Sequence, residues 1–251
     1  MKELMKMEGI SLTYHTKTSE TEALKDLRFS LFEGEFVAIV GPSGCGKTSV
    51  LSVIAGLLAP TEGKVSFPLK GESKHYIGYM LQKDELFPWR SIWKNVILPL
   101  EIQRAKSEEN LNYVSLLLKK YGLYDFRNYF PSQLSGGMKQ RAALIRTLAL
   151  RPELLLLDEP FSALDYQTRL SVCDDVYAII KSEKKTALLV THDIGEAIST
   201  ADRVIVLSGR PARIKNVYSL RQPQNLSPLA RREDPSSKRW FDLIWKELHE
   251  G

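Results

Sequence analysis

The chain has 251 residues and a net charge of +5, which is long enough to bury a substantial core as one domain. Its composition, 43% hydrophobic and 26% charged, is ordinary for a globular protein and excludes a disordered or fibrous one. No window approaches the roughly 18 uncharged apolar residues that a membrane span needs, and the N-terminus lacks the apolar segment of a signal peptide. Two cysteines give no disulfide framework, so a reducing, cytoplasmic setting is expected. The basic residues form no long run, and charge alone gives little reason to expect nucleic-acid binding.

The first segments alternate between apolar and polar residues, over residues 5–14 and from Leu24 to Phe32, and predict two strands. Tyr14 falls near the end of the first strand. An aromatic ring there can stack on adenine, but aromatic residues are also common as half-buried strand residues. The pattern alone favours the second interpretation.

The glycine-rich segment that follows is the most informative in the chain. The apolar run 36–40 predicts a strand, Ser49 to Ala55 predicts a helix, and a loop with three glycines joins them. This is the context of a phosphate-binding P-loop, whose backbone N–H groups and helix N-terminus surround the phosphates. Lys47 is expected to reach the β- and γ-phosphates, and the Thr48 hydroxyl to bind Mg²⁺. The predicted nucleotide-binding residues of this segment are Gly41, Pro42, Ser43, Gly44, Cys45, Gly46, Lys47, Thr48 and Ser49.

Short strands are predicted next, over Lys64 to Phe67 and Tyr76 to Leu81, and the second ends on Gln82. A glutamine at the end of a strand can coordinate Mg²⁺ or its water, although most such residues are simply solvated. After an apolar loop, Ser91 is expected to cap a helix from Ile92 to Leu100. The tryptophans of this region, Trp89 and Trp93, fit a partner contact and local packing equally well.

Two more helices follow. Apolar residues at helical spacing predict one over Ser107 to Tyr121. The segment Leu134–Arg141 opens the other, which continues through Leu150. Ser135, Gly136 and Gly137 at its start form a second potential anion site, because a helix N-terminus offers free N–H groups. A chain with two such sites either binds two phosphates or uses the second on another subunit's nucleotide.

Acidic residues end the next apolar run. Leu154–Asp158 resembles a strand that is buried on both faces of a parallel sheet. Asp158 is expected to hold Mg²⁺ through its water, and Glu159 to act as general base towards the attacking water. Ser162–Asp165 then turns into a helix that reaches about Lys181.

The chain then returns to the sheet. A strand over 187–191 ends on His192, where a structural and a catalytic role are equally compatible with the sequence. Two short strands follow at 204–207 and 214–218, and the stretch 221–228 is expected to be flexible. A closing helix starts at Pro235, which suits the first helical position. Its apolar stripe is expected to pack on the chain's own domain, the alternative being a membrane-facing or partner surface. The stripe consists of Trp240, Phe241, Ile244, Trp245 and Leu248.

Taken in order, these motifs resemble the ATP-binding subunit of an ABC transporter over essentially the full chain. The most specific of them is Leu134-Ser135-Gly136-Gly137, the family's signature, which lies between the P-loop and the Leu154–Asp158 strand. The resemblance implies an α/β P-loop NTPase fold with a RecA-like core, N-terminal antiparallel β strands and a helical subdomain. The single ABC ATPase domain would cover residues 1–251, with the core at about 1–84 and 151–230, the helical subdomain at about 85–150 and a C-terminal helix at about 235–249.

The resemblance also implies roles that the residues alone leave open. Tyr14 would stack on adenine, and Gln82 would sense the γ-phosphate and, with Thr48 and Asp158, serve the metal. His192 would position the water beside Glu159. The signature residues Ser135, Gly136 and Gly137 would bind the γ-phosphate of ATP held by the opposite subunit, and Asp165 would couple the two sites.

The function implied is that of an ATPase in an importer, peripheral on the cytoplasmic face of the membrane, with ATP and Mg²⁺ as cofactors. Its partners would be a second, identical ATP-binding subunit, a transmembrane permease and, indirectly, an extracytoplasmic solute-binding protein, with no nucleic acid. Leu86–Trp89 followed by Asn95-Val96, together with Leu134–Met138, resembles the nitrate, sulfonate and taurine importer group, and thiamine-precursor importers look similar. Met138 departs from the usual glutamine, and Ile145–Thr147 from Ala-Arg-Ala. The alternatives are a soluble ABC ATPase acting on nucleic acid or ribosomes, and a small-molecule kinase.

Overall fold

The computed structural model describes residues 2–15, 18–68, 77–220 and 226–249. The chain divides into two compact units, one made of Met1–Lys74 with Lys184–Gly251, the other of His75–Glu183. Within the described ranges, every helix is too short or too polar to cross a bilayer.

The first unit contains an antiparallel sheet in the order β2-β1-β4. Strand β1 (Glu3–His15) pairs with β2 (Glu20–Phe32) on one side and β4 (Glu62–Ser66) on the other. The side chains of Leu24, Leu27 and Leu31 on β2 are fully buried, and their uneven spacing accompanies the register shifts in the β1–β2 pairing. The two predicted N-terminal strands are therefore confirmed, each a few residues longer than expected.

The same unit holds the parallel strands on which the phosphate loop is built. Strand β3 (Phe36–Val40) lies between β7 (Thr186–Val190) and β8 (Arg203–Leu207) and is parallel to both, while β9 (Ile214–Ser219) pairs antiparallel with β8. All residues of β3 and β7 are buried, which explains their unbroken apolar sequences. Ligands of such sheets bind at the carboxyl ends of the strands, and helix α1 (Lys47–Ile54) begins there after β3.

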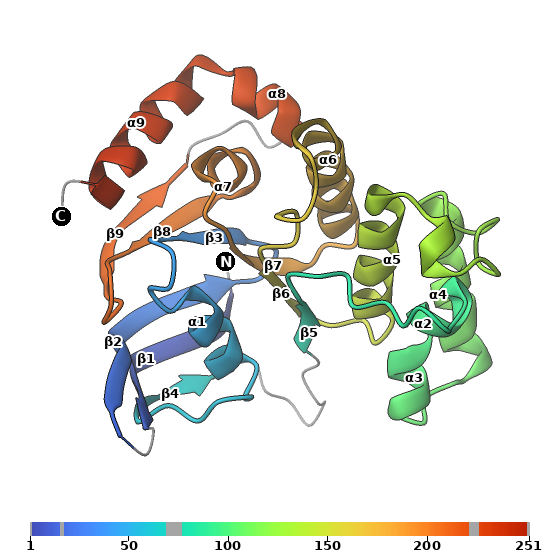
Figure 1. The fold of residues 1–251 in the computed structure, drawn as a ribbon, viewed down its shortest axis with the longest axis horizontal. Helices are drawn as coiled ribbons and strands as arrows, with labels where there is room; N and C mark the ends of the chain where they lie inside the picture. Colours follow the sequence, from blue (N-terminus) through green and yellow to red (C-terminus); the bar gives the residue numbers. More distant parts are fainter. Residues whose placement is uncertain (1, 16–17, 69–76, 221–225, 250–251) are drawn as a thin grey trace. The chain divides into compact units, whose positions relative to one another are not determined.

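Helices α7 (Ile194–Thr200) and α9 (Pro235–His249) pack on the strands β3 and β8 respectively, and α8 (Pro228–Glu233) packs on these two helices (Figure 1). In α9, Ile244 is fully buried and Trp240 lies edge-on against Tyr218. Phe241 and Trp245 of the same stripe stack on one another and stay exposed. The stripe thus packs on its own unit with only part of its residues.

Helices α7 and α8 were not predicted, although both carry local start signals. Asp193 caps α7 by accepting a hydrogen bond from the N–H of Glu196 at 2.9 Å, an Asp-x-x-Glu pattern typical of helix starts. Ser227 caps α8 through the N–H of Ala230, with proline at the first position. Of the stretch expected to be flexible, 221–225 lie outside the described residues, and its last residues are the start of a helix.

The second unit contains two parallel strands, β5 (Ile77–Met80) and β6 (Leu154–Asp158), and a group of helices. The predicted residue Tyr76 at the start of β5 lies outside the described residues. Helix α5 (Gly136–Leu148) is central, since α2, α3, α4, α6 and β5 all contact it (Figure 1). The other helical elements are α2 (Ile92–Val96), α3 (Leu98–Ile102), α4 (Glu108–Lys120), the 3₁₀ turn Pro131–Gln133 and α6 (Tyr166–Ser182).

One predicted helix of this unit is in fact two. The sequence predicted a continuous helix from Ile92 to Leu100, but α2 ends at Val96 and α3 starts at Leu98. The reason is Pro99, which fits only the first turn of a helix because it has no N–H to donate. The expected helical subdomain, 85–150, falls within this unit, together with β5, β6 and α6.

Candidate nucleotide site

The phosphate loop connects β3 to α1 through backbone conformations that need glycine. Gly44 and Gly46 have φ angles of 70° and 120°, values that side-chain-bearing residues rarely adopt. Gly41 is needed for space, because a Cβ there would lie 2.9 Å from Cys45 Sγ and 3.1 Å from Leu207 Cβ. The loop is therefore pressed against β8 on one side, and its shape depends on all three glycines of the motif.

Lys47, the first residue of α1, folds back over this loop. Its ammonium donates hydrogen bonds to the carbonyls of Gly41 at 2.9 Å and Pro42 at 3.0 Å, and the residue is only 6% exposed. The neighbouring Cys45 is buried, which raises the pKa of its thiol, while the positive charge of Lys47 opposes the shift. Cys45 thus stays a neutral packing residue, and Lys47 is held at the place where phosphates are expected.

Tyr14 lies beside the phosphate loop, as its predicted role requires. Its hydroxyl is 2.9 Å from the Ser49 hydroxyl on α1, and the side chain is 39% exposed. The ring is thus partly accessible and lies next to the predicted phosphate site. An exposed fraction of 39% is compatible with a half-buried strand residue as well, so stacking on adenine stays a prediction.

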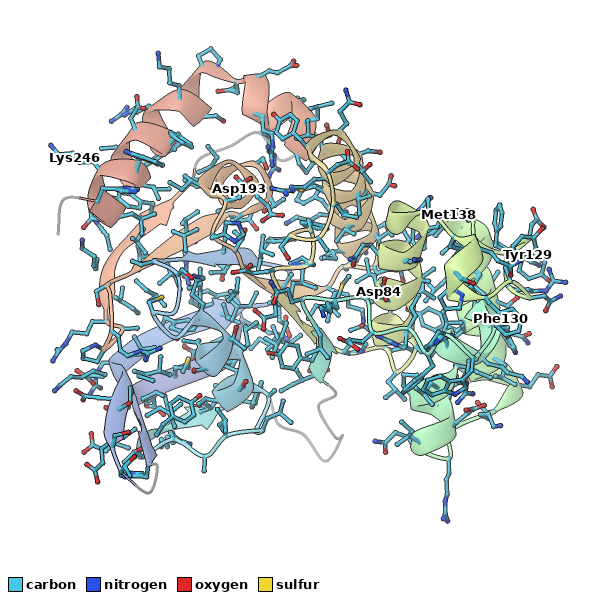
Figure 2. The ribbon with its side chains drawn as sticks, viewed as in Figure 1. Asp84, Tyr129, Phe130, Met138, Asp193 and Lys246 are labelled. Atoms are coloured by element: carbon cyan, nitrogen blue, oxygen red, sulfur yellow. The ribbon has the colours of Figure 1, made fainter. Side chains whose placement is uncertain are left out.

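His192 follows β7 directly and is exposed. The backbone on both sides of it is fixed: Thr191 donates its N–H to the Ile39 carbonyl at 3.2 Å, and Asp193 donates its N–H to the Thr191 hydroxyl at 3.1 Å. Thr191 in turn donates its hydroxyl to the Glu196 carboxylate. Figure 2 labels Asp193 on this turn. The side chain of His192 therefore projects from an anchored position at the carboxyl end of a parallel strand.

In the second unit, Asp158 and Glu159 end β6. Asp158 is buried and accepts a hydrogen bond from the Tyr79 hydroxyl at 3.3 Å. Glu159 has a φ angle of 44°, a left-handed conformation that costs free energy for a residue with a side chain and is often found at functional sites. The amide of Gln82 donates to the Glu159 carboxylate at 3.5 Å and to the Ser162 hydroxyl at 3.4 Å. The structure thus brings the predicted residues Gln82 and Glu159 together.

The signature residues meet Asp165 in the same unit. An open cavity of about 600 Å³ is lined by Ser135, Gly136, Gly137 and Asp165, among others. Ser135 caps α5 by accepting from the Met138 N–H at 3.3 Å, and Asp165 caps α6 by accepting from the Thr168 N–H at 3.0 Å. Hydrogen bonds from Thr168, first from its side chain and then from its backbone N–H, lower the pKa of Asp165. Two helix N-termini therefore open into one cavity, whose charged lining residues are Arg141, Asp165 and Asp175. The helix N-termini and Arg141 favour an anion there, and the two carboxylates oppose it.

The two signature glycines also have a packing role. A Cβ on Gly136 would lie 2.9 Å from Leu164 Cδ2, and one on Gly137 would lie 2.8 Å from Val172 Cγ2. Gly137 is buried, whereas Ser135 and Gly136 are exposed. Glycine at both positions is thus explained by close packing against the Leu164 turn and α6, in addition to any contact with phosphate.

Several residues that shape the site were not predicted. Tyr79 is one. Arg146 is another, because its guanidinium donates to the carbonyls of Asp84 and Glu85, both at 2.7 Å, and so anchors the loop that follows Gln82 (Asp84 is labelled in Figure 2). No short-range pattern identifies these contacts, since Arg146 and Asp84 are 62 residues apart.

The third residue that was not predicted is Asn95, which is fully buried on α2. Its Oδ1 accepts from the Phe87 N–H at 2.7 Å, and its Nδ2 donates to the carbonyls of Phe87, Arg90 and Ser91 at 3.1, 2.9 and 3.1 Å. One amide side chain therefore satisfies four backbone groups and fixes the whole loop 87–91.

Replacing Asn95 with Ala is expected to lower the free energy of unfolding by about 2 kcal/mol or more, because buried backbone groups would lose their partners. Thermal and urea denaturation followed by circular dichroism would measure the change. Asn112→Ala is the matched control, since Asn112 is exposed on α4, and should be nearly neutral. Equal stability of the two variants would contradict the assigned role of Asn95.

The chain is similar to known ABC transporter ATP-binding proteins. Residues 24–162 match the ABC transporter family model. An uncharacterized ABC transporter ATP-binding protein of Bacillus subtilis, YtlC, is 46% identical over 97% of this chain and 95% of its own length. The formylaminopyrimidine import ATP-binding protein ThiZ of Halalkalibacterium halodurans is 39% identical, over 84% of this chain and 82% of its own. The taurine import ATP-binding protein TauB of Ruegeria pomeroyi is 38% identical, over 86% and 82%.

A solved structure agrees with these relatives. The dimeric post-hydrolysis state of the ATP-binding cassette MJ0796, bound to ADP and Pi, superposes with a TM-score of 0.71 and 33% identity, covering 88% of this chain and 100% of that one. The chain therefore belongs to the ABC transporter family as an ATP-binding subunit, a P-loop ATPase with the cassette fold.

Proposed function

We propose that this ATPase energises the import of a small solute through a separate membrane permease, docked as a peripheral subunit at the cytoplasmic face. The relatives named for import, of formylaminopyrimidine and of taurine, support import over export and keep the expected substrate among small solutes of that kind. The solute itself would be selected by the permease and an external binding protein.

The observation on which the proposal rests is an apolar groove next to the hydrolysis residues. The groove, about 380 Å³ in volume, is formed by β5, the loop after Gln82, α3 and the end of α5. Among its lining residues Leu81, Phe87 and Ile102 are exposed apolar side chains. Exposed apolar grooves of this kind mark protein contacts. We propose that a short segment of the permease occupies it.

The groove lies next to the residues that we propose for ATP hydrolysis. Leu81 of the groove precedes Gln82, whose amide donates to the Glu159 carboxylate at 3.5 Å. A partner that shifts the loop after β5 would therefore move Gln82 relative to Glu159. Trp89 lies on the loop fixed by Asn95 and is strongly exposed. Its ring centroid is 5.1 Å from that of Phe87, so its side chain would extend the same contact surface.

The residues suggest how ATP is hydrolysed. Lys47 and the N–H groups of the phosphate loop would bind the β- and γ-phosphates, and the Tyr14 ring would stack on adenine. The Glu159 carboxylate would accept a proton from the water that attacks the γ-phosphate, and His192 would help to orient that water. The strained backbone of Glu159 fits a side chain whose direction is set by this task.

Magnesium is the metal that the donor set suits. Thr48, Gln82 and Asp158 offer hydroxyl, amide and carboxylate oxygens, the hard donors that Mg²⁺ prefers, and Mg²⁺ bound with nucleotide would neutralise phosphate charge. Phosphate oxygens and water would supply the remaining ligands, as is usual for this ion.

We further propose that two copies of the chain enclose two ATP molecules head to tail. The cavity lined by Ser135 and Asp165 is separate in sequence from the phosphate loop and is built from two helix N-termini. An anion site of this kind fits the γ-phosphate held by an opposite subunit. The similar cassette that was solved with ADP and Pi is a dimer.

The groove gives the test of the import proposal. Ile102→Glu places a charge on a groove residue that is 69% exposed, so the fold should tolerate it while the apolar contact is lost. A pull-down of the tagged chain from gently solubilised host membranes should recover a polytopic permease with the unchanged chain and lose it with Ile102→Glu.

Leu116→Glu is the control, because Leu116 is exposed on α4 and does not line the groove. It should retain the permease, and both variants should keep the basal ATPase rate of the isolated chain. Recovery of only soluble protein or nucleic acid with the unchanged chain would contradict a role in transport.

A further inference from the structure

An arginine outside every motif considered so far contacts the phosphate loop. Arg210 lies in the turn between β8 and β9, and its Nη2 donates a hydrogen bond of 2.6 Å to the carbonyl of Gly44. The two residues are 166 positions apart. The guanidinium also lies over the glycine itself, since a Cβ built on Gly44 would be 3.9 Å from Nη2.

The contacted peptide group holds the loop in shape. On one side, the Gly44 carbonyl accepts from Arg210; on the other, the N–H of the same peptide group, that of Cys45, donates to the Pro42 carbonyl at 3.3 Å. Gly44 has a φ angle of 70°, and nothing but hydrogen bonds keeps such a permissive residue in one conformation. The Arg210 bond thus acts at a residue whose own type places little restriction on the backbone.

The turn that carries Arg210 is itself firmly anchored. The Ser208 N–H donates to the Arg213 carbonyl at 2.9 Å, and the Arg213 N–H donates to the Ser208 hydroxyl at 2.9 Å, which closes the turn. Ala212 is fully buried and pairs with β2, donating its N–H to Ala23 at 2.9 Å and accepting from the Lys25 N–H at 3.0 Å. Arg210 therefore extends towards the loop from a fixed base.

The loop has fixed neighbours on its other sides. Gly46 lies so close to β2 that a Cβ there would be 2.9 Å from Leu24 Cδ2, and Gly41 is in similar contact with Leu207 of β8. The segment around Gly44 is exposed, and the nearest atom that a Cβ on Gly44 would meet is Nη2 of Arg210. Arg210 contacts the loop at this segment and brings a permanent positive charge close to a site built for phosphates.

We propose that Arg210 is a positioning residue for nucleotide binding: it holds the Gly44–Cys45 peptide of the phosphate loop in the binding conformation. The proposal concerns the ATP site of the family and does not depend on import. Because the loop surrounds the phosphates common to both nucleotides, the role predicts equal effects on ATP and ADP. A residue that touched the γ-phosphate directly would affect ATP alone.

The test measures the affinities of the purified full-length chain for fluorescent mant-ATP and mant-ADP with Mg²⁺. Arg210→Gln is expected to weaken both by the same factor, about 3- to 10-fold, the size of one exposed charge-assisted hydrogen bond. The KM for ATP should rise in parallel, with kcat at saturating ATP within about twofold of the unchanged chain, as for a loss of uniform binding. Arg210→Lys, which keeps a charge and a donor, should recover most of the affinity.

The control is Arg213→Gln, which removes the same charge from an exposed arginine of the same turn. The bonds that close the turn come from the backbone of Arg213, so the substitution should leave the turn intact. It should bind both nucleotides normally. The proposal is overturned if Arg210→Gln binds as tightly as Arg213→Gln, if only the ATP affinity falls, or if kcat falls with KM unchanged. None of these outcomes bears on the permease, so they cannot be mistaken for failure of the import proposal.

Discussion

Glu159→Gln is expected to lower the kcat of ATP hydrolysis by at least about 100-fold, the contribution of a positioned general base. Glutamine has nearly the shape of glutamate, so the left-handed backbone at this residue and the neighbouring Gln82 should be little disturbed. The amide has no carboxylate to accept the proton of the attacking water. ATP affinity should therefore stay within about threefold of the unchanged chain, since ground-state binding does not require the base.

Two measurements accompany this variant. Because ATP would bind without being hydrolysed, size-exclusion chromatography with ATP should show dimers accumulating, alone or with the permease. Glu153→Gln, an equal charge change at the exposed residue that precedes β6, should leave kcat unchanged. Hydrolysis that persists in Glu159→Gln would assign the base elsewhere, and a variant that stayed monomeric under both conditions would contradict the two-subunit arrangement.

Lys47→Ala is expected to weaken ATP binding by about 100-fold, the effect of losing charge-assisted hydrogen bonds to two phosphates. The ammonium is nearly buried and already directed into the loop by the carbonyls of Gly41 and Pro42. Its removal also leaves these carbonyls without that donor, so the empty loop should be less well ordered. Hydrolysis at cellular ATP concentrations should then be undetectable.

Titration with mant-ATP, together with the shift in melting temperature that ATP causes, would measure this loss. Lys64→Ala is the control, since Lys64 is exposed on β4 and pairs with Glu8, and it should bind ATP as the unchanged chain does. Binding by Lys47→Ala within about twofold of the control would show that the backbone N–H groups alone hold the phosphates.

Local patterns predicted the elements that carry the site. The strand and helix around the phosphate loop, the strand that ends at Asp158 and the cap at Ser91 all depend on residues close together in the chain, so their signals are present in the local sequence. The Asp193–Glu196 spacing is also a local signal, which indicates the start of α7. Pro99 is a local signal for the break between α2 and α3, because proline fits only the first turn of a helix.

Contacts between distant residues were beyond that reasoning. Arg210 meets Gly44 only because β8 lies beside β3, and Arg146 reaches Asp84 only because α5 packs against β5. The backbone conformation of Glu159 contradicts its residue type's preference, so no propensity could indicate it. Asn95 reads as an ordinary helical residue until its four backbone partners are seen.

The close packing at the signature links the start of α5 to the segment that follows Glu159. A Cβ on Gly136 would lie 2.9 Å from Leu164 Cδ2, and one on Gly137 would lie 2.8 Å from Val172 Cγ2. A larger residue at either position would therefore have to displace the Leu164 or the Val172 side chain, on either side of the cap Asp165. In the proposed two-subunit arrangement, a γ-phosphate bound at Ser135 would thus lie at a helix start that is in direct contact with the turn after Glu159.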